Sequence, residues 1–328
     1  MNPKTKYILI VVCTFCITIV SYFLIDLFLK TKQSTAKANI PSFAEKINPF
    51  KEPEIEKVPI KILFVGDIML DRTIRKDGEQ YGYEKLFECL AEPFSQYDEV
   101  IGNLEGTITN FTSVSRDAAY TAPESFRFTF DIQAVQSLVD IGLSVVSLAN
   151  NHIKDFGDEG INQTIQNAYT LGLTTFGDPR STSQHWVIKE TNGTKIAHIP
   201  YNQFFGTTKQ TLDDLKTVQN QSDIQIIFAH WGDEYVIARS DTKLLAHSFV
   251  DAGADLIIGA HPHIIQESEI YNAVPIYYSI GNFIFDQYFE EAVTKGLAVE
   301  VELMDGKIAL TKEYNLLSTR HNGTCFVK

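Results

Sequence analysis

"DIQIIFAHWGDEYVIARSDTKLLAHSFVDAGADLIIGAHPH" (residues 223–263) holds two short apolar runs with an amphipathic segment between them. The first run ends at His230 and the second at His261, where the chain continues as His-Pro-His. A short apolar run closed by glycine or polar residues is typical of a buried strand, and the longer segment between the runs has the pattern of a helix. This order of strand, helix and strand favours an α/β protein.

The same alternation extends over most of the chain. Apolar runs in KILFVGD (61–67), DEVIGNLEG (98–106) and LSVVSLANNH (143–152) are separated by amphipathic segments. After Pro275 the segments alternate like sheet strands, with turns such as Asp305-Gly306 between them. We therefore expect one α/β domain over residues 61–328.

The N-terminal segment has a different character. YILIVVCTFCITIVSYFLI (residues 7–25) carries no charge and is long enough to cross a bilayer as a helix. The small-residue pattern at 36–38 lies well beyond the apolar run, which favours an uncleaved signal anchor in residues 1–30 over a cleaved signal peptide. Residues 31–60 have the composition of a stalk. Lysines on both sides of the span leave its orientation open by charge, and we expect the bulk of the chain to be extracytoplasmic.

The charge and the cysteines restrict the possible partners and cross-links. A formal net charge of -13 disfavours nonspecific binding to nucleic acid. Four cysteines are too few for a disulfide scaffold. Cys89 and Cys325 can pair only if folding brings them together, which the sequence leaves open.

Polar side chains of a few types follow the apolar runs. In open α/β sheets, ligands bind at the carboxyl ends of strands, so these side chains can meet. On an extended strand end, alternate side chains point the same way, so we expect the last two histidines to face one point. The residues at these positions are Asp67, Glu105, Asn151, His152, His230, His261 and His263.

Two carboxylates, one amide and three imidazoles suit one or two divalent cations such as Zn, Mn or Fe. A carboxylate of Asp67 or Glu105 can bridge two metals, which leaves His152 as a candidate general acid. Each residue also has an ordinary structural role open to it: a helix cap for Asp67, a turn for Asn151, core packing for His230. The repeated position at strand ends favours the metal site.

Six ordered motifs make the chain resemble a known family. They are GDIMLDR (66–72), NLEG (103–106), ANNHIKDFGDEG (149–160), HWGDEY (230–235), GAHPH (259–263) and SIGNFIFDQ (279–287). These motifs resemble the poly-γ-glutamate capsule biosynthesis (CapA) family, a branch of the calcineurin-like metallophosphoesterases. The resemblance covers residues 61 to about 290.

The resemblance implies a four-layer α/β/β/α sandwich with the metal site at its strand ends. It assigns metal ligation to the six residues other than His152, and it places His152 as the catalytic histidine. We add Asp155, from the same motif, and Arg72 as candidate catalytic residues; Arg72 can bind a substrate phosphate or carboxylate, or form a surface salt bridge. The broader superfamily has Asp-x-His where this chain has Asp67 and Met69, a poor ligand, so a second metal position is in question.

Two functions fit these expectations. One is metal-dependent hydrolysis, on a capsule polymer or, alternatively, as a phosphoesterase acting on a phosphorylated small molecule or a cell-envelope substrate. The other is a membrane-anchored component of a poly-γ-glutamate synthesis and export machine. The partners implied are further membrane subunits of a capsule synthase or export complex, and an anionic polymer or phosphoester, but no nucleic acid.

Overall fold

The computed structural model describes residues 58–90, 94–182 and 184–327. The predicted signal anchor, in residues 1–30, and nearly all of the predicted stalk, in residues 31–60, lie outside the described residues. Among those described, no helix has the length and apolar character that crossing a membrane requires.

The first sheet has eight strands, and its centre is parallel. β1 runs parallel to β2, β2 to β5 and β5 to β6, while β14 lies antiparallel on the other side of β1. In spatial order the strands are β16 (Gly323–Phe326), β15 (Lys307–Thr319), β14 (Lys295–Met304), β1 (Ile60–Ile68), β2 (Glu99–Leu104), β5 (Val145–Ser147) and β6 (Thr174–Phe176), and β13 (Asn282–Ile284) pairs with β1.

The second sheet has six strands, four of them parallel. β8, β9, β10 and β12 are parallel neighbours, and β9 and β10 carry the two apolar runs of the opening stretch. In spatial order the strands are β11 (Ser268–Tyr271), β12 (Val274–Tyr277), β10 (Leu256–Ala260), β9 (Ile224–His230), β8 (Thr194–Asn202) and β7 (Val187–Thr191). A separate pair is formed by β3 (Thr107–Ile108) and β4 (Thr129–Phe130).

Five α-helices and three short 3₁₀ helices connect the strands within the described residues. They are α2 (Arg72–Tyr81), α4 (Ile132–Asp140), α5 (Gly157–Thr170), α6 (Thr208–Val218), α7 (Ser240–Asp251), η1 (Glu84–Phe87), η2 (Pro123–Phe126) and η3 (Ala292–Thr294). The residue that caps α2 is Asp71, whose side chain accepts from the Arg72 amide. Asp67 therefore serves no helix as a cap.

The two sheets face each other through a shared apolar core. Ile62 and Phe64 of β1 point into it from the first sheet, and Phe228 and Ile258 meet them from the second. The rings of Phe64 and Phe228 lie 6.3 Å apart between centroids. Because side chains alternate along a strand, the residues between these positions belong to the outer faces of the sheets.

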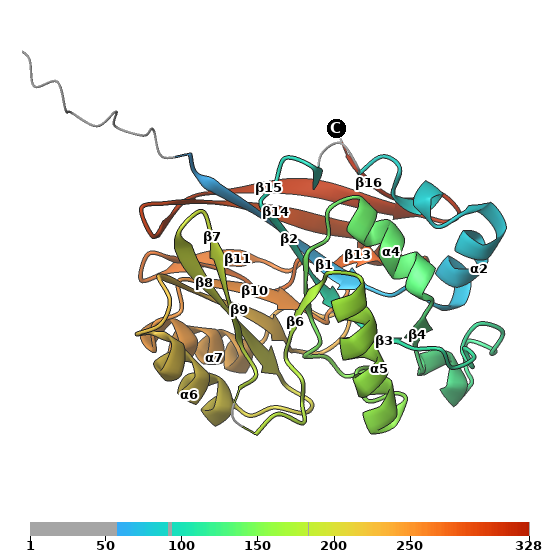
Figure 1. The fold of residues 1–328 in the computed structure, drawn as a ribbon, viewed down its shortest axis with the longest axis horizontal. Coiled ribbons are helices and arrows are strands. Elements are labelled where there is room, and N and C mark those ends of the chain that lie inside the picture. The colour runs from blue at the N-terminus through green and yellow to red at the C-terminus, as the bar shows by residue number, and fades with distance from the viewer. Residues whose placement is uncertain (1–57, 91–93, 183, 328) are drawn as a thin grey trace, which may run out of the picture. The chain divides into compact units, whose positions relative to one another are not determined.

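Helices cover both outer faces (Figure 1). Leu63 of β1 packs in one core with residues of α4 and α5, and Ile227 of β9 packs in another with Leu215 of α6 and Phe249 of α7. The layers are therefore helices, sheet, sheet and helices. The predicted α/β architecture is confirmed, and it is consistent with a metallophosphoesterase-like domain.

The C-terminal strands form the hairpin that the sequence predicts. β14 and β15 pair antiparallel on either side of the turn Asp305-Gly306. Both turn residues have positive φ, 53° and 69°, as a type I′ turn requires, and Asp-Gly is among its preferred sequences.

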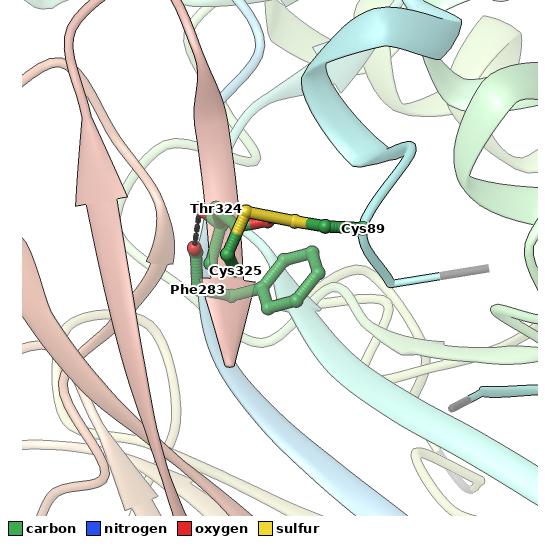
Figure 2. The surroundings of a disulfide bond; sticks show 4 residues. All are labelled: Cys89, Phe283, Thr324 and Cys325. Atoms are coloured by element: carbon green, nitrogen blue, oxygen red, sulfur yellow. Dashed lines mark hydrogen bonds between the residues drawn. A yellow bond between two sulfur atoms is a disulfide. The ribbon is translucent and has the colours of Figure 1, made fainter. Parts of the chain in front are cut away.

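A disulfide joins two parts of the chain that are distant in sequence (Figure 2). Cys89, just after η1, bonds to Cys325 of β16, with 5.6 Å between their Cα atoms. Beside it, the Thr324 hydroxyl donates to the Phe283 carbonyl at 2.5 Å. Folding thus answers the pairing question that the sequence left open.

Candidate metal centre

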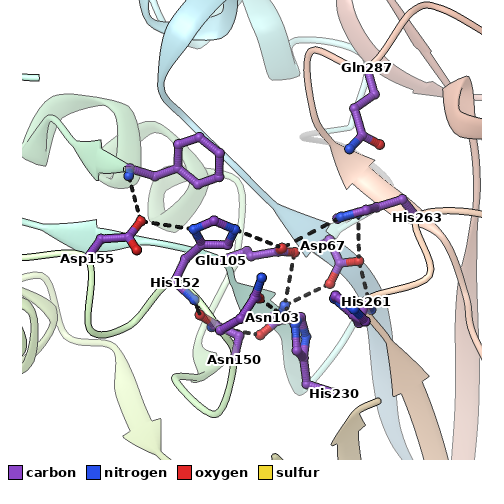
Figure 3. A network of polar contacts seen from close by, with 12 residues as sticks. Asp67, Asn103, Glu105, Asn150, His152, Asp155, His230, His261, His263 and Gln287 are labelled. Carbon is purple, nitrogen blue, oxygen red and sulfur yellow. Dashed lines mark hydrogen bonds and ion pairs between the residues drawn. The ribbon is translucent and has the colours of Figure 1, made fainter. Parts of the chain in front are cut away.

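Five side chains from the strand ends of both sheets gather at one point (Figure 3). Asp67 lies near the end of β1, Glu105 follows β2, His230 ends β9, and His261 and His263 follow β10. All five are almost completely buried, with exposed fractions of at most 4%. These residues are five of the six predicted metal ligands, and the sixth, Asn151, is described below.

The local packing explains why a glycine precedes Asp67. β13 pairs parallel with β1, and just before it the chain runs so close that a Cβ atom on Gly66 would lie 1.8 Å from the Gly281 carbonyl oxygen. That same oxygen accepts a hydrogen bond from the Asp67 amide at 3.2 Å. The close approach fixes the backbone at the point where the carboxylate enters the site.

The donor atoms form two overlapping groups. Glu105 with His261 and His263 is one, and Asp67 with Glu105 and His230 is the other; in each, the ligand atoms lie within 4.8 Å of one another. Glu105 belongs to both groups, so its carboxylate would be a ligand of a cation held by either one.

Two buried atoms in these groups test whether a cation fits. Glu105 Oε1 and His261 Nδ1 are buried, and neither has a hydrogen-bond partner among the described residues. Leaving such polar atoms unpaired in the interior is costly. A divalent cation held by these residues would satisfy both atoms, and the mixture of carboxylate and imidazole donors suits Mn, Zn or Fe.

The pKa shifts of the two carboxylates also favour a bound cation. Burial opposes the charge of Asp67, yet the hydrogen bond and charge of His263, with the charge of His230, lower its pKa below the usual range. Burial, reinforced by the neighbouring Asp67 carboxylate, raises the pKa of Glu105 well above its usual value. Two carboxylates buried this close together need a compensating positive charge if both are to ionise.

Two of the three imidazoles have lowered pKa values. Burial, with the nearby His261, lowers the pKa of His230 well below its usual value. Burial, with the nearby His263, lowers the pKa of His261 to about 4. Both shifts favour the neutral ring, which is the form of imidazole that binds metal ions.

His261 and His263 converge for a different reason from the one predicted. β10 ends at Ala260, and the two histidines have φ values of 96° and 59°, so they do not continue an extended strand. Positive φ is uncommon for residues other than glycine and is retained where the surroundings impose it. The Asp67 carboxylate imposes it in part, because Oδ2 accepts from the His261 amide at 3.1 Å. A strained turn, rather than strand alternation, brings the two rings to 5.9 Å between centroids.

Asn103 was missed by the sequence reasoning and lies at the centre of the site. Its side-chain amide donates to Asp67 Oδ1 at 2.7 Å, and it lies 3.2 Å from Nδ1 of His230. Its oxygen accepts from the Asn150 side chain at 3.1 Å. The sequence offered one indication of this role. Asn103 precedes Glu105 by two residues, so on an extended chain both side chains project from the same face.

Asn151, the sixth predicted ligand, also reaches the site. Its Oδ1 lies 2.8 Å from Nε2 of His230. Asn150 instead turns inward, donating to the Leu104 carbonyl at 2.8 Å. Asn151 is thus the amide of this pair that faces a predicted imidazole ligand, and its role as a metal ligand stays a prediction.

Behind His263, a hydrogen-bonded chain sets the orientation of its ring. Nδ1 lies 2.9 Å from Asn282 Oδ1, and Asn282 donates to Gln287 Oε1 at 3.2 Å. Because an amide oxygen only accepts, this contact places a proton on Nδ1 and turns Nε2 toward the site. That nitrogen lies 3.7 Å from Glu105 Oε1. Asn282 lies in the motif SIGNFIFDQ, but no ligand position was expected there.

His152 and Asp155 form a pair beside the predicted metal ligands. His152 Nδ1 lies 2.9 Å from Asp155 Oδ2, and that oxygen also accepts from the Phe128 amide at 2.8 Å. On the other side of the ring, Nε2 lies 3.9 Å from Glu105 Oε1. The Phe128 ring packs against the imidazole, with 4.3 Å between centroids. His152 therefore faces the site with Nε2 while Asp155 fixes its other nitrogen.

Arg72 and Met69 are both buried. Arg72 Nη2 pairs with Asp286 Oδ1 at 2.5 Å, in an ion pair that is buried rather than on the surface. The guanidinium also lies over the Phe128 ring, 4.9 Å from its centroid. Met69 packs in the core beneath the first sheet. A direct role for Arg72 in substrate binding stays a prediction.

Comparisons with known proteins match the part of the chain that carries this site. The profile of the family described as bacterial capsule synthesis protein PGA_cap matches residues 61–287. The chain is 31% identical over 243 residues to the PGA biosynthesis protein CapA of Bacillus subtilis (strain 168), covering 68% of this chain and 63% of that protein. It thus spans less than two thirds of that relative's length.

A second relative and a solved structure extend the comparison. The capsule biosynthesis protein CapA of Bacillus anthracis is 28% identical over 293 residues, covering 81% of this chain and 69% of that protein. The crystal structure of a hypothetical protein from Thermus thermophilus superposes with a TM-score of 0.53 at 17% identity, covering 78% of this chain and 98% of that one. The structural match supports the fold alone.

Proposed function

The chain belongs to the bacterial capsule synthesis protein family PGA_cap, and on that premise we propose that it is a metal-binding component of poly-γ-glutamate capsule synthesis or export with hydrolase-type chemistry. The observation that carries the proposal is the buried centre of Asp67, Glu105 and three histidines. Its unpaired Glu105 Oε1 and His261 Nδ1 suit a cation. The names of the two Bacillus relatives supply the capsule context.

The residues around the centre would have different roles in catalysis. Asp67, Glu105, His230, His261 and His263 would hold one or two divalent cations, with Asn151 as a further ligand. When bound, such a cation supplies Lewis-acid stabilisation of developing negative charge and lowers the pKa of water. Asn103 holds the Asp67 carboxylate and His230 in place through its side-chain amide.

His152 supplies the proton. Because Asp155 accepts from Nδ1, the imidazole presents Nε2 toward the ligands, where a protonated Nε2 can donate to a leaving group. The contact with Asp155 fixes the orientation of the ring through Nδ1. The Phe128 ring covers one face of the imidazole and limits water access to it.

The proposal includes a location at the outer face of the cell membrane. The uncharged stretch at residues 7–25 supports an anchor, and the Cys89–Cys325 disulfide supports an oxidising compartment. In that location the partners would be further membrane subunits of a capsule synthase or export complex. An anionic polymer or a phosphoester is the proposed substrate.

Deletion of residues 1–40 is expected to release the protein from membranes, because the long uncharged apolar stretch lies there. Fractionation of cells that express the full-length and shortened chains, followed by immunoblotting, measures this. The full-length chain in the same host is the control. A shortened chain that stays entirely in the membrane fraction would contradict the proposed anchor.

The hydrolase chemistry is tested with manganese-loaded full-length protein and two probes. Bis(p-nitrophenyl) phosphate reports phosphodiester cleavage, and poly-γ-glutamate chain length reports amide cleavage. We expect turnover of at least one probe that stops when a chelator removes the metal. Cleavage of the phosphodiester alone would favour a phosphoesterase acting on a phosphorylated molecule. Tight metal binding without turnover of either probe would contradict hydrolysis and leave an assembly role.

A further inference from the structure

A groove lined by aromatic side chains adjoins the metal centre. It has a volume of about 660 Å³. We call it the aromatic groove, and its lining residues are Thr73, Tyr120, Phe126, Glu234, Tyr235, Asp286, Tyr288, Phe289 and Arg320. The Tyr235 ring lies 5.9 Å from the ring of the predicted ligand His263, between centroids. Tyr235 thus links the groove to the candidate metal centre.

The aromatic side chains of the groove are exposed in pairs. Tyr120 and Phe126 are 52% and 47% exposed, and their rings meet edge to face at 6.0 Å. Tyr235 and Phe289 are 37% and 55% exposed, and their rings meet in the same way at 5.3 Å. Single exposed aromatic residues are ordinary, but several gathered around one hollow mark a binding site.

The wall nearest the metal centre is rigid. Tyr235 has a φ of 63°, and its amide donates to the Pro262 carbonyl at 2.9 Å. Its hydroxyl accepts from Gln287 Nε2 at 2.9 Å, and Gln287 is joined through Asn282 to His263. The Tyr235 wall and the His263 ligand therefore belong to one hydrogen-bonded assembly, which holds the groove in shape beside the metal site.

The charges of the groove do not suit a polyanion. Asp286 is neutralised by the buried Arg72, and its other oxygen accepts from the Thr73 amide at 3.1 Å. The remaining charged residues are one acid, Glu234, and one base, Arg320, which lies over the Tyr288 ring at 5.3 Å. A run of carboxylates would meet Glu234 with only one cation to offset the repulsion.

We propose that the aromatic groove binds a neutral sugar ring. The C–H bonds on one face of a pyranose form an apolar surface that stacks on aromatic rings, and its hydroxyl groups both donate and accept. Glu234 can accept from those hydroxyls, and Arg320 can donate to them. This inference goes beyond the proposed function and holds whether or not the metal centre turns over a substrate.

Calorimetric titration of full-length protein with two neutral probes, cellotriose and the N-acetylglucosamine trimer, tests the proposal. We expect at least one probe to bind, and Tyr120→Ala and Phe289→Ala each to weaken it about tenfold, because each removes a stacking face. Tyr120→Phe keeps the ring and should retain the affinity. Tyr169→Ala, at a tyrosine of α5 that is 78% exposed, is the matched control and should change nothing.

The outcomes separate this inference from the proposed function. His261→Ala is expected to keep sugar binding even where it loses metal. Failure of both probes to bind, or binding that survives Tyr120→Ala and Phe289→Ala, would overturn the sugar assignment without touching the metal centre. Binding of a γ-glutamate oligomer in place of the sugars, with the same dependence on Tyr120 and Phe289, would also overturn it.

Discussion

His261→Ala and His263→Ala are each expected to abolish stoichiometric metal binding while the protein stays folded. Loss of a residue that only supports a metal ligand commonly costs ~10–100-fold in affinity, so loss of a ligand should exceed that range. Each substitution also places alanine at a position with positive φ, which can destabilise the fold, so the fold must be checked by circular dichroism. Metal content after dialysis, with titration of manganese and zinc, gives the measurement.

The matched control is His321→Ala. His321 also has positive φ, 66°, and pairs with a carboxylate, Asp77, but it belongs to neither group of candidate ligands. It should therefore keep full metal content. If both His261→Ala and His263→Ala also keep the stoichiometry of the unmodified protein, the candidate metal centre is wrong.

His152→Ala is expected to keep its metal and lose turnover by ~10²–10⁴-fold, the usual contribution of a general acid. The geometry gives the reason, since His152 Nε2 faces the ligands from 3.9 Å while Nδ1 is taken by Asp155. The rate on the physiological substrate and the metal content are measured on the same preparation.

Asn151→Ala distinguishes a ligand from a proton donor at the adjacent position. Its Oδ1 faces His230, so its loss should lower metal content and turnover together. Full activity of His152→Ala on the physiological substrate would contradict acid catalysis, and the site would then be a binding or structural metal centre.

The positions of the predicted metal ligands followed from the sequence because the topology leaves few alternatives. Parallel strands end at a common edge, so Asp67 of β1 and Glu105 after β2 had to be neighbours, as had His230 and His261 in the second sheet. The family resemblance, and not the strand pattern, supplied the expectation that the edges of the two sheets meet at one point. The pattern of strands and helices alone does not determine how two sheets face each other.

Features that depend on tertiary contacts were not predictable in this way. The positive φ values of His261 and His263 follow in part from the contact with Asp67, which is 194 residues away from His261. The burial of Arg72 follows from Asp286, a residue far along the chain. Asn103 looked like an ordinary strand residue because an amide is recognised as a site residue only when its neighbours are known.

The Cys89–Cys325 disulfide changes how the protein would respond to a pulling force on its two ends. The bond closes a loop with a sequence separation of 236 residues, so roughly 800 Å of extended chain stays hidden from the force. Glu105 and the ligand histidines lie inside the loop, whereas Asp67 lies outside it, on the central strand β1. Tension would therefore act on β1, α2 and η1, which precede Cys89, while residues 89–325 stay covalently closed. A cation bound by Asp67 and Glu105 would then oppose the separation of β1 from the rest of the domain.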